Sequence, residues 1–312
     1  MIRNEKLNIN IFNYDESYDK PQVICLGFFD CIHLGHLKLF NKAKLLSHLN
    51  NLEISCFTFE NNPLSYFSDQ KLVYTFEERI ILFSSLNINN VFKAYFDDKF
   101  LSLNKEDFLN NLCMNKNIKA IVCGEDYTFG YKKEGNVDYL KKYCIKNNIE
   151  LYIEDLKLSN NKKISSKSIR NMLIDGEIEE ANKLLISPYS ASGKVISGKG
   201  IGSKKIYPTI NIQLNQEKVI IKPGVYYTLT CIDGVSFKSV TNVGTKPTLN
   251  DYSKNIETYI LFYNKDLYNK EITIKFIKRI RDIAKFNTID ELKNQISKDI
   301  DYVLTIWGKK YD

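Results

Sequence analysis

The sequence has no stretch of about 18 uncharged apolar residues, which excludes a membrane-spanning helix. Its first residues also lack an apolar segment followed by a small-residue cleavage site, so we do not expect export. The seven cysteines form no C-x-x-C pair and have no metal-ligand spacing, and several stand in apolar runs. Buried free thiols in a reducing compartment fit this pattern, and we therefore expect a cytoplasmic protein.

Dense blocks of Lys and Arg interleaved with aromatic residues are also missing, so we expect no nucleic-acid partner. The formal net charge of +7 is nevertheless unevenly distributed. Residues 1–186 hold 24 Lys and Arg against 25 Asp and Glu, a net of −1, whereas residues 187–312 hold 20 against 12, a net of +8. This excess indicates either an anionic ligand of the second half or a solvated Lys-rich surface.

The first half alternates short apolar runs with segments of helical periodicity. The pattern predicts strands in QVICLGFF, LEISCFTF, NVFKAYF, KAIVCG and IELYIEDL, with helices between them. Because parallel strands need crossover connections, this repetition predicts an α/β domain with a parallel sheet covered by helices. Ligands of such domains bind beyond the carboxyl ends of the strands.

The pattern of apolar and polar residues changes after SSKSIRNMLIDGEIEEANKLL, a segment that predicts two short helices. Residues 187–312 are rich in strand patterns separated by Gly and Pro, and Asp233-Gly234 is a strong hairpin signal. Strands without intervening helices predict a small antiparallel β-barrel. A C-terminal helix would begin at Thr288, with Glu291 completing a capping box. We place the domain boundary between residues 186 and 187.

Two of the three histidines stand in GFFDCIHLGH, directly after an apolar strand. Gly35 would let a phosphate approach the backbone, and a helix that starts there would present free N–H groups and the positive end of its dipole. His33 and His36 could donate hydrogen bonds to phosphate oxygens and disperse the charge that develops when a nucleotide α-phosphate is attacked. Asp30 could bind a ribose, an ammonium group or hydrated Mg²⁺. A polar turn beside a core histidine is the alternative, which the H-x-G-H spacing disfavours.

A second segment, KISSKSIR at residues 163–170, combines hydroxyl groups with cations at a predicted helix start. Its hydroxyl and N–H groups could hold the β- and γ-phosphates of ATP, while Lys167 or Arg170 stabilises the leaving pyrophosphate. An ordinary helix N-cap with solvated cations is the alternative interpretation of this segment.

Together the two segments resemble the paired motifs of the HxGH nucleotidyltransferases, whose fold is Rossmann-like. Between them, FTFENNP, LVYTFEERIILFSSL and VCGEDYTFGYKKEGN resemble the adenylyltransferase module of the bacterial bifunctional riboflavin kinase/FMN adenylyltransferase (FAD synthetase) family. The resemblance implies an FMN adenylyltransferase in residues 1–186, with His33, His36 and Arg170 as catalytic residues. It implies ATP contacts at Gly27, Phe28, Asp30, His33, Gly35, His36, Ser165, Ser166 and Lys167.

In that family, the segment that matches Gly124 to Gly130 helps to form the flavin side of the pocket. The resemblance therefore implies flavin contacts at Asn62, Asp126, Tyr127 and Phe129. An aromatic wall for an isoalloxazine ring is physically sensible. Taken alone, Tyr127 and Phe129 would be ordinary core residues.

The second half resembles the riboflavin kinase of the same family, in which a glycine-rich loop leads into P-T-x-N; here the loop is SGKGIGSKK and the motif lies in YPTINI. Thr209 and Asn211 stand two apart on a strand, so they could share a Mg²⁺ ion, the cofactor that we expect with ATP. Glu257 matches the catalytic glutamate, which would take the proton of the riboflavin 5′-hydroxyl as its oxygen attacks the γ-phosphate. The resemblance also implies ATP contacts at Gly198, Gly200, Gly202 and Pro208 and a flavin contact at Arg281.

The resemblance covers roughly residues 22–305 and includes several departures from the family's pattern. Cys31 stands where glycine is usual, so its side chain would crowd the nucleotide or a positive φ would strain it. The other departures are Lys167 for threonine, Asn62 for histidine, Ser203 for arginine, Lys205-Ile206 for Leu-Gly, and Ile283 for an acidic residue. None removes a proposed phosphate ligand, the metal pair or Glu257, so we expect both activities.

Two alternatives stay open at this point. A class I aminoacyl-tRNA synthetase would share the HLGH and KISSKS signatures, although the short chain and the β-rich second half disfavour it. A non-catalytic flavin-binding paralogue is the other alternative, given the departures. For the bifunctional enzyme we expect riboflavin, FMN, FAD and ATP as partners, no nucleic acid or membrane, and at most weak self-association.

Overall fold

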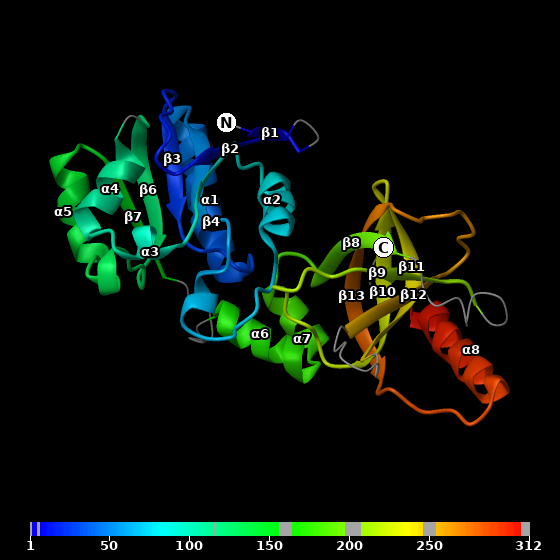
Figure 1. Cartoon of the computed structure of the whole chain (residues 1–312). Coiled ribbons are helices and arrows are strands. Elements are labelled where there is room, and N and C mark those ends of the chain that lie inside the picture. Colours follow the sequence, from blue (N-terminus) through cyan, green and yellow to red (C-terminus); the bar gives the residue numbers. More distant parts are fainter. Residues whose placement is uncertain are drawn as a thin grey trace. The chain divides into compact units, whose positions relative to one another are not determined.

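The computed structural model describes residues 2–4, 7–114, 116–155, 164–196, 207–245 and 254–306 (Figure 1). The chain divides into two units, Met1–Ser166 and Lys167–Asp312. Helix α7 (Ile178–Leu184) and all but the first residue of α6 (Ser166–Asp175) belong to the second unit. The sequence analysis assigned both helices to the first domain, so its boundary at residue 186 stays a prediction about where the two functions divide.

A seven-stranded sheet forms the centre of the first unit, with the order β1-β2-β5-β4-β3-β6-β7. The strands are β1 (Ile2–Asn4), β2 (Ile9–Asn13), β3 (Gln22–Leu26), β4 (Glu53–Phe59), β5 (Asn90–Ala94), β6 (Ile118–Gly124) and β7 (Glu150–Glu154). All neighbours pair in parallel except β1, which is antiparallel to β2 at the edge. The predicted parallel sheet is confirmed, but the sequence analysis missed β1 and β2.

Helices lie on both sides of this sheet (Figure 1). They are α1 (Leu34–Asn50), α2 (Phe76–Ser85), α3 (Asp98–Leu101), α4 (Lys105–Cys113) and α5 (Val137–Lys146), with 3₁₀ turns η1 (Pro63–Tyr66) and η2 (Tyr131–Lys133). Alternate residues of β3 face opposite layers: Ile24 packs with α4 and α5, whereas Cys25 Sγ lies 3.7 Å from the carbonyl oxygen of Leu39 in α1. Because β3 lies between β4 and β6, the strand order reverses there, and such folds bind ligands outside the carboxyl ends at this point.

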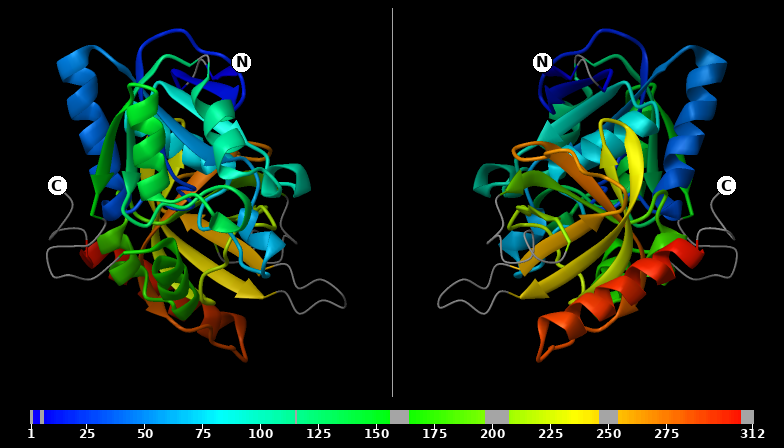
Figure 2. Two further views of the ribbon diagram at one scale, coloured as in Figure 1. Left: turned by 90° about the vertical axis from the view of Figure 1, so that its left-hand side faces the viewer. Right: turned by 90° about the vertical axis from the view of Figure 1, so that its right-hand side faces the viewer.

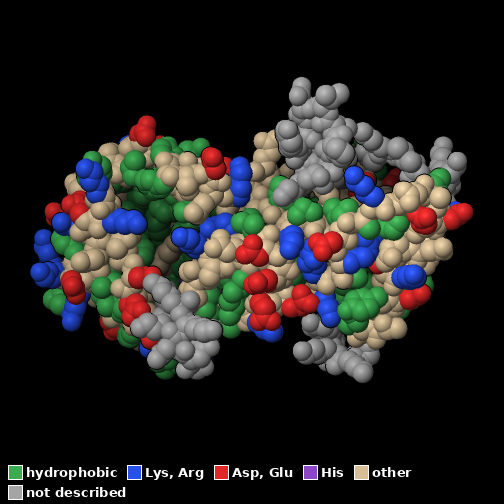
Figure 3. Space-filling model, turned by 90° about the horizontal axis from the view of Figure 1, so that it is seen from below, with side chains coloured by type: hydrophobic (Ala, Val, Ile, Leu, Met, Phe, Trp, Pro, Cys, Tyr) green, Lys and Arg blue, Asp and Glu red, His purple; other side chains and the backbone are tan. Residues whose placement is uncertain are grey.

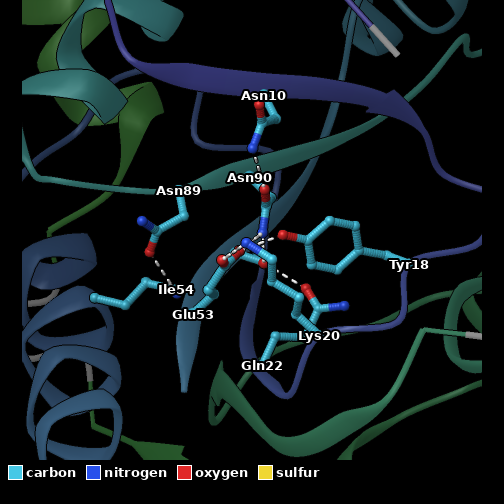
Figure 4. Close-up of polar contacts among 9 residues, drawn as sticks. Asn10, Tyr18, Lys20, Gln22, Glu53, Ile54, Asn89 and Asn90 are labelled. Atoms are coloured by element: carbon cyan, nitrogen blue, oxygen red, sulfur yellow. Dashed lines mark hydrogen bonds and ion pairs between the residues drawn. The ribbon is translucent and has the colours of Figure 1, made fainter. Parts of the chain in front are cut away.

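A polar network braces the amino ends of these strands (Figure 4). Asn90 of β5 donates from Nδ2 to Glu53 Oε2 (2.9 Å) and accepts a hydrogen bond from Asn10 Nδ2 (2.9 Å). Lys20 Nζ lies 2.8 Å from Glu53 Oε1, and the Tyr18 hydroxyl donates to the same carboxylate. Burial and the hydrogen bond to Glu53 raise the pKa of Tyr18 to about 12. Since these side chains satisfy one another, the amino ends of the strands are structural, and they lie opposite the carboxyl ends where ligands bind in such folds.

The second unit contains a closed antiparallel barrel with the order β10-β11-β12-β9-β8-β13 and a C-terminal helix against it (Figure 1 and Figure 2). Its elements are β8 (Ser190–Ile196), β9 (Thr209–Ile212), β10 (Gly224–Ile232), β11 (Val235–Thr245), β12 (Lys254–Ile260), β13 (Glu271–Arg281) and α8 (Ile289–Ile306). The predicted barrel and C-terminal helix are confirmed. No helix of the described residues is long and apolar enough to cross a membrane.

The two faces of the barrel strands differ. On one face, Val225 and Val240 pack with Val303 of α8. On the other face the side chains are fully buried hydroxyls: Thr228 Oγ1 lies 2.8 Å from Ser239 Oγ and 2.7 Å from Thr241 Oγ1. The hydrogen-bonded hydroxyls therefore fill part of the barrel interior, and the cavity described below lies on the face that α8 covers.

Local sequence signals place the turns as predicted. Asp233 and Gly234 join β10 to β11 with φ values of 49° and 83°, the conformation of a tight hairpin turn. Before α8, Thr288 Oγ1 accepts from the N–H of Glu291 (3.1 Å), as predicted. The Glu291 carboxylate, however, accepts from the N–H of Asn287 (2.9 Å), one residue earlier than in the predicted capping box.

Candidate active sites

The loop after β3 is shaped by packing. Phe29 adopts a φ of 53°, and its buried ring lies 5.0 Å from that of Phe40. A Cβ at Gly27 would lie 2.8 Å from the Phe29 ring, so this approach needs glycine. Asp30 is 1% exposed, and its Oδ1 accepts a hydrogen bond from the N–H of Val73 (2.8 Å). Asp30 thus anchors the loop that leads into α1.

The two histidines of H-x-G-H form a stacked pair at the start of α1, with ring centroids 3.7 Å apart. His33 is the N-cap, and its Nδ1 accepts from the N–H of His36 (3.1 Å), so the neutral ring carries its proton on Nε2. His36 Nδ1 lies 2.7 Å from the carbonyl oxygen of Cys31, to which it must donate. His33 therefore offers an Nε2–H donor, whereas His36 offers an Nε2 that can take up a proton.

Both rings are neutral in the protein without ligand. Burial, reinforced by the neighbouring His36 ring, lowers the pKa of His33 to about 2. Burial also lowers the pKa of His36 to about 4, although the Cys31 carbonyl and the Asp126 carboxylate oppose this change. An anion bound beside the rings and the first N–H groups of α1 would favour the protonated forms.

The histidines line a cavity of about 890 Å³ at the carboxyl end of the sheet. In Figure 3, hydrophobic side chains gather in a hollow of this unit. Aromatic rings form a large part of the wall; they include Phe28, Phe57, Phe59, Phe67, Phe96, Phe100, Phe108, Tyr127 and Phe129. Many meet edge to face, as Phe59 and Phe96 do at 5.2 Å. Such a wall suits a flat ring system of mainly apolar character.

This cavity brings together most of the residues predicted for the first site. The predicted residues that line it are Gly27, Phe28, His33, His36, Asp126, Tyr127, Phe129, Ser165 and Ser166. Gly35 is buried in the first turn of α1 instead. Asn62 caps η1, where its Oδ1 accepts from the N–H of Leu64 (3.1 Å) and its Nδ2 donates to the carbonyl oxygen of Gln70 (2.8 Å). In the second unit, α6 carries Lys167, which is exposed, and Arg170, which is buried.

A smaller cavity of about 250 Å³ lies between the barrel and α8. Glu257 and Thr209 line it, and the register places Glu257 of β12 opposite Asn211 of β9. Asn211 is 3% exposed, and its Oδ1 has no hydrogen-bond partner among the described residues. Asn211 does not line the cavity, but it stands two residues after Thr209 on β9 and opposite Glu257 on β12. A buried amide oxygen that lacks a partner, with a hydroxyl and a carboxylate at these positions, fits a hard cation such as Mg²⁺.

Other predicted residues of the second half are placed as follows. Pro208 is exposed directly before β9. Arg281 lines the smaller cavity, but its guanidinium is paired with Asp299 of α8 (NH2 to Oδ2, 2.7 Å). The predicted Gly198, Gly200 and Gly202 lie outside the described residues, as do the departures Ser203, Lys205 and Ile206.

The expectation that Cys31 crowds the nucleotide or strains the turn is not met by this geometry. Cys31 is fully buried, does not line the cavity, and has no positive φ; the residue with positive φ in this loop is Phe29. The Cys31 thiol lies 3.4 Å from Ser166 Oγ, so it touches a residue that does line the cavity. Ile283 lines the smaller cavity as part of its apolar wall.

Comparison with known proteins gives the same division into two halves. A family model described as FAD synthetase matches residues 15–168, and one described as riboflavin kinase matches residues 185–307. The bifunctional riboflavin kinase/FMN adenylyltransferase of Buchnera aphidicola subsp. Schizaphis graminum is 36% identical over 296 residues, which cover 92% of this chain and 93% of that protein. The chain belongs to this family.

Further relatives agree with the assignment. The bifunctional riboflavin kinase/FMN adenylyltransferase of Listeria monocytogenes is 33% identical over 290 residues, covering 91% of this chain and 92% of that protein. A crystal structure described as a macrolide-efflux protein from Streptococcus pneumoniae is 29% identical and superposes with a TM-score of 0.85 over 97% of this chain and 99% of that one. The chain is a bifunctional riboflavin kinase and FMN adenylyltransferase, as the resemblance predicted, and the tRNA synthetase alternative is wrong.

The segment TFEER, residues 75–79, contains a residue that the sequence analysis did not single out. Arg79 of α2 is fully buried, and its NH1 donates to the carbonyl oxygen of Phe28 (3.0 Å) while its NH2 donates to that of Phe59 (2.7 Å). Phe28 and Phe59 both line the larger cavity. Burial lowers the pKa of Arg79 to about 10, which still leaves it charged. The signal that could have revealed it was an arginine on an otherwise buried helix face.

Proposed function

We propose that the larger cavity holds ATP and FMN for adenylyl transfer, and the smaller cavity riboflavin for phosphorylation. The stacked His33–His36 pair, which opens into an aromatic cavity, is the observation that carries this proposal. In the first reaction, an FMN phosphate oxygen attacks the α-phosphorus of ATP, and pyrophosphate leaves. His33 Nε2–H and the first N–H groups of α1 would stabilise the charge on the α-phosphate, Phe28 would contact ATP, and Tyr127 and Phe129 would hold the flavin ring.

Ser165, Ser166, Lys167 and Arg170 belong to the same proposal. Their hydroxyl groups and positive charges suit the β- and γ-phosphates and the leaving pyrophosphate. Ser165 and Ser166 support this role because they line the larger cavity. Gly27 also lines this cavity, which supports its proposed contact with ATP. The geometry favours a loop-anchoring role for Asp30 and a capping role for Asn62 over direct contact.

In the second reaction, Glu257 would accept the proton of the riboflavin 5′-hydroxyl as its oxygen attacks the γ-phosphorus of ATP, and ADP would leave as the bond to its β-phosphate oxygen breaks. Thr209 and Asn211 would hold the Mg²⁺ ion, which neutralises charge on the phosphates. The buried, unpaired Oδ1 of Asn211 supports this assignment. Gly198, Gly200, Gly202 and Pro208 are the further residues that we expect to contact ATP, because glycines let backbone amides approach phosphates.

We also propose a cytoplasmic location and small-molecule partners alone. The location is supported by the seven free cysteines, five of which are buried. ATP, riboflavin, FMN and FAD are the partners that the family assignment supports. Weak self-association and the absence of a nucleic-acid partner stay predictions from the sequence.

A reciprocal pair of variants tests the two-site assignment. FMN and FAD formed from Mg-ATP and riboflavin, and FAD formed from supplied FMN, are separated by chromatography and quantified. We expect Glu257→Ala to abolish FMN formation and to leave FAD synthesis from supplied FMN intact. His36→Ala should do the opposite. If either variant remains folded and loses both reactions, the assignment is wrong.

A further inference from the structure

A buried ion pair joins the end of the barrel to the C-terminal helix. The Asp299 side chain on α8 is 3% exposed, and that of Arg281 at the end of β13 is 22% exposed. Arg281 Nε lies 3.0 Å from Asp299 Oδ1, and Arg281 NH2 lies 2.7 Å from Asp299 Oδ2. Two parallel hydrogen bonds of this kind fix the orientation of both groups.

Arg281 and Asp299 each have one further hydrogen-bond partner. Arg281 NH1 donates to the carbonyl oxygen of Asp282 (3.0 Å), and Gln295 Nε2 donates to Asp299 Oδ1 (3.0 Å). A buried pair this well satisfied is kept together strongly, because the loss of one partner leaves the other charge desolvated and unpaired. The guanidinium of Arg281 is therefore occupied by its pairing with Asp299 of α8. We interpret Arg281 as a residue that positions α8 and not as a direct flavin contact.

The pair lies at the end of the smaller cavity that is remote from Glu257. Strand register connects the two ends, because Glu257 stands opposite Asn242, Asn242 opposite Val225, and Val225 opposite Arg281. Three steps between neighbouring strands correspond to roughly 14 Å along the barrel wall. These four barrel residues line the cavity together with Asp299 of α8.

The wall beyond the pair is apolar and comes from the segment that the pair secures. Ile283, Ala284 and Phe286 follow Arg281 directly, and Leu292 and Ile296 belong to the first turns of α8. The Arg281 guanidinium lies 6.0 Å from the Phe286 ring centroid. If Glu257 meets the 5′-hydroxyl, the flavin ring system has to occupy this remote, apolar end of the cavity.

We propose that Asp299 is a positioning residue of the riboflavin kinase site: paired with Arg281, it holds α8 and residues 282–288 over the part of the cavity that accepts the flavin ring. This inference rests on the proposed assignment of Glu257 to the 5′-hydroxyl. A group that shapes only the ring end contributes equally to the binding of substrate and transition state. Its loss therefore raises KM for riboflavin and leaves kcat nearly unchanged.

The test is steady-state kinetics of Asp299→Asn, with FAD synthesis from supplied FMN measured on the same preparations. We expect KM for riboflavin to rise about tenfold or more while kcat changes less than about threefold, the pattern of lost uniform binding. FAD synthesis should stay at the level of the unmodified enzyme. Asp233→Asn is the matched control: it removes an exposed barrel carboxylate at a hairpin turn and should change neither constant.

Two further variants guard against misfolding and test the pairing. Asp299→Glu keeps the charge, so it should recover part of the KM defect. In Arg281→Gln/Asp299→Asn, the defect should equal that of Asp299→Asn alone, because the two residues act as one unit. An unchanged KM in Asp299→Asn, a larger KM defect in the double variant than in Asp299→Asn, or a fall in kcat at constant KM would each overturn the proposal.

The outcome is separable from a failure of the proposed function. If Glu257→Gln kept its full kcat, the assignment of the smaller cavity to riboflavin chemistry would be wrong. If Glu257→Gln lost kcat but Asp299→Asn kept its KM, only the positioning role of Asp299 would be wrong.

Discussion

The two cavities of this chain offer different chemical groups. The larger cavity, of about 890 Å³, offers neutral histidines at a helix N-terminus and a wall of aromatic rings. The smaller cavity, of about 250 Å³, is lined by strand-borne oxygen donors, Glu257 and an ion pair with α8. Proton-bearing donors at a helix N-terminus suit attack at an α-phosphate, whereas a carboxylate and a cation site suit proton transfer from a hydroxyl.

The largest expected difference between the cavities concerns metal binding. Asn211→Leu removes an amide oxygen that has no other partner in the described part of the chain. We expect riboflavin phosphorylation at fixed Mg²⁺ to fall roughly 10- to 100-fold, with the Mg²⁺ concentration at half-maximal rate shifted upward. FAD synthesis from supplied FMN should not change its Mg²⁺ dependence. A kinase rate with unaltered Mg²⁺ dependence would contradict the assignment.

Backbone strain should also separate the two units. Gly130 in the larger cavity has a φ of 75°, and a Cβ there would lie 2.7 Å from the backbone nitrogen of Lys105. We expect Gly130→Ala to destabilise the first unit by about 1–3 kcal/mol and to impair FAD synthesis. Gly234, with a φ of 83° and no neighbour within 4 Å of an added Cβ, is the matched control. Gly234→Ala should cost about 1 kcal/mol and leave both activities intact. If calorimetry showed equal losses of stability for Gly130→Ala and Gly234→Ala, the contact between the added Cβ and Lys105 would not be the source of the strain.

As pH decreases, the free energy of unfolding of the first unit should fall before that of the second, because all three histidines lie in residues 1–166. The pKa values of His33 and His36 are lowered in the folded protein to about 2 and about 4. Below the unfolded value of about 6.5 the unfolded chain binds protons that the folded chain does not, so stability falls as pH decreases through this range. Between pH 6.5 and 5.5 we expect a loss of ~1 kcal/mol per histidine.

Calorimetry at several pH values in the presence and absence of ATP would check this. His33→Asn should flatten the pH dependence of the first transition and leave the second unchanged. A first transition that is independent of pH across this range in the unmodified protein would refute the proposed neutral pair. ATP should reduce the slope, because a bound anion raises the pKa of both rings.

The smallest expected effect concerns the rim of the larger cavity. The Phe67 side chain lines this cavity although the residue is 70% exposed, so its removal carries little risk to folding. We expect Phe67→Ala to raise KM for FMN about threefold, the loss of one partly exposed aromatic contact. KM for riboflavin in the kinase reaction should not change. A larger effect on riboflavin than on FMN would place the flavin of the first reaction elsewhere.

Much of the architecture was predictable because it follows from local patterns. Alternating apolar runs and helical segments predicted the parallel sheet, and Asp233-Gly234 predicted the hairpin of the barrel. Strand β1 was missed because it is only three residues long and lies at the sheet edge. Strand β2 was missed because only two of its five residues are buried, so no buried run marks it. The sequence analysis placed α6 and α7 in the first domain, whereas the structure groups nearly all of them with the second unit. A helix pattern does not say against which unit a helix packs.

The histidine pair shows where sequence information ends. The spacing of His33 and His36 by itself determined that two imidazoles stand at a strand-to-helix junction, because three residues make almost one helical turn. Which nitrogen carries the proton, and that both rings are neutral, depended on burial and on the hydrogen bonds to the backbone of His36 and Cys31. Those contacts exist only in the folded chain.

The sequence alone determined the family, the two-part fold and the chemistry, because motifs and periodicities are local and survive without coordinates. The tertiary structure alone decided which polar groups face a cavity and which are used internally. It turned Asp30 and Asn62 toward the backbone, left Asn211 Oδ1 unpaired, and committed Arg281 to Asp299 of α8. The physical reason is that a buried polar group takes the partner that folding brings within reach, and that partner can be many residues away.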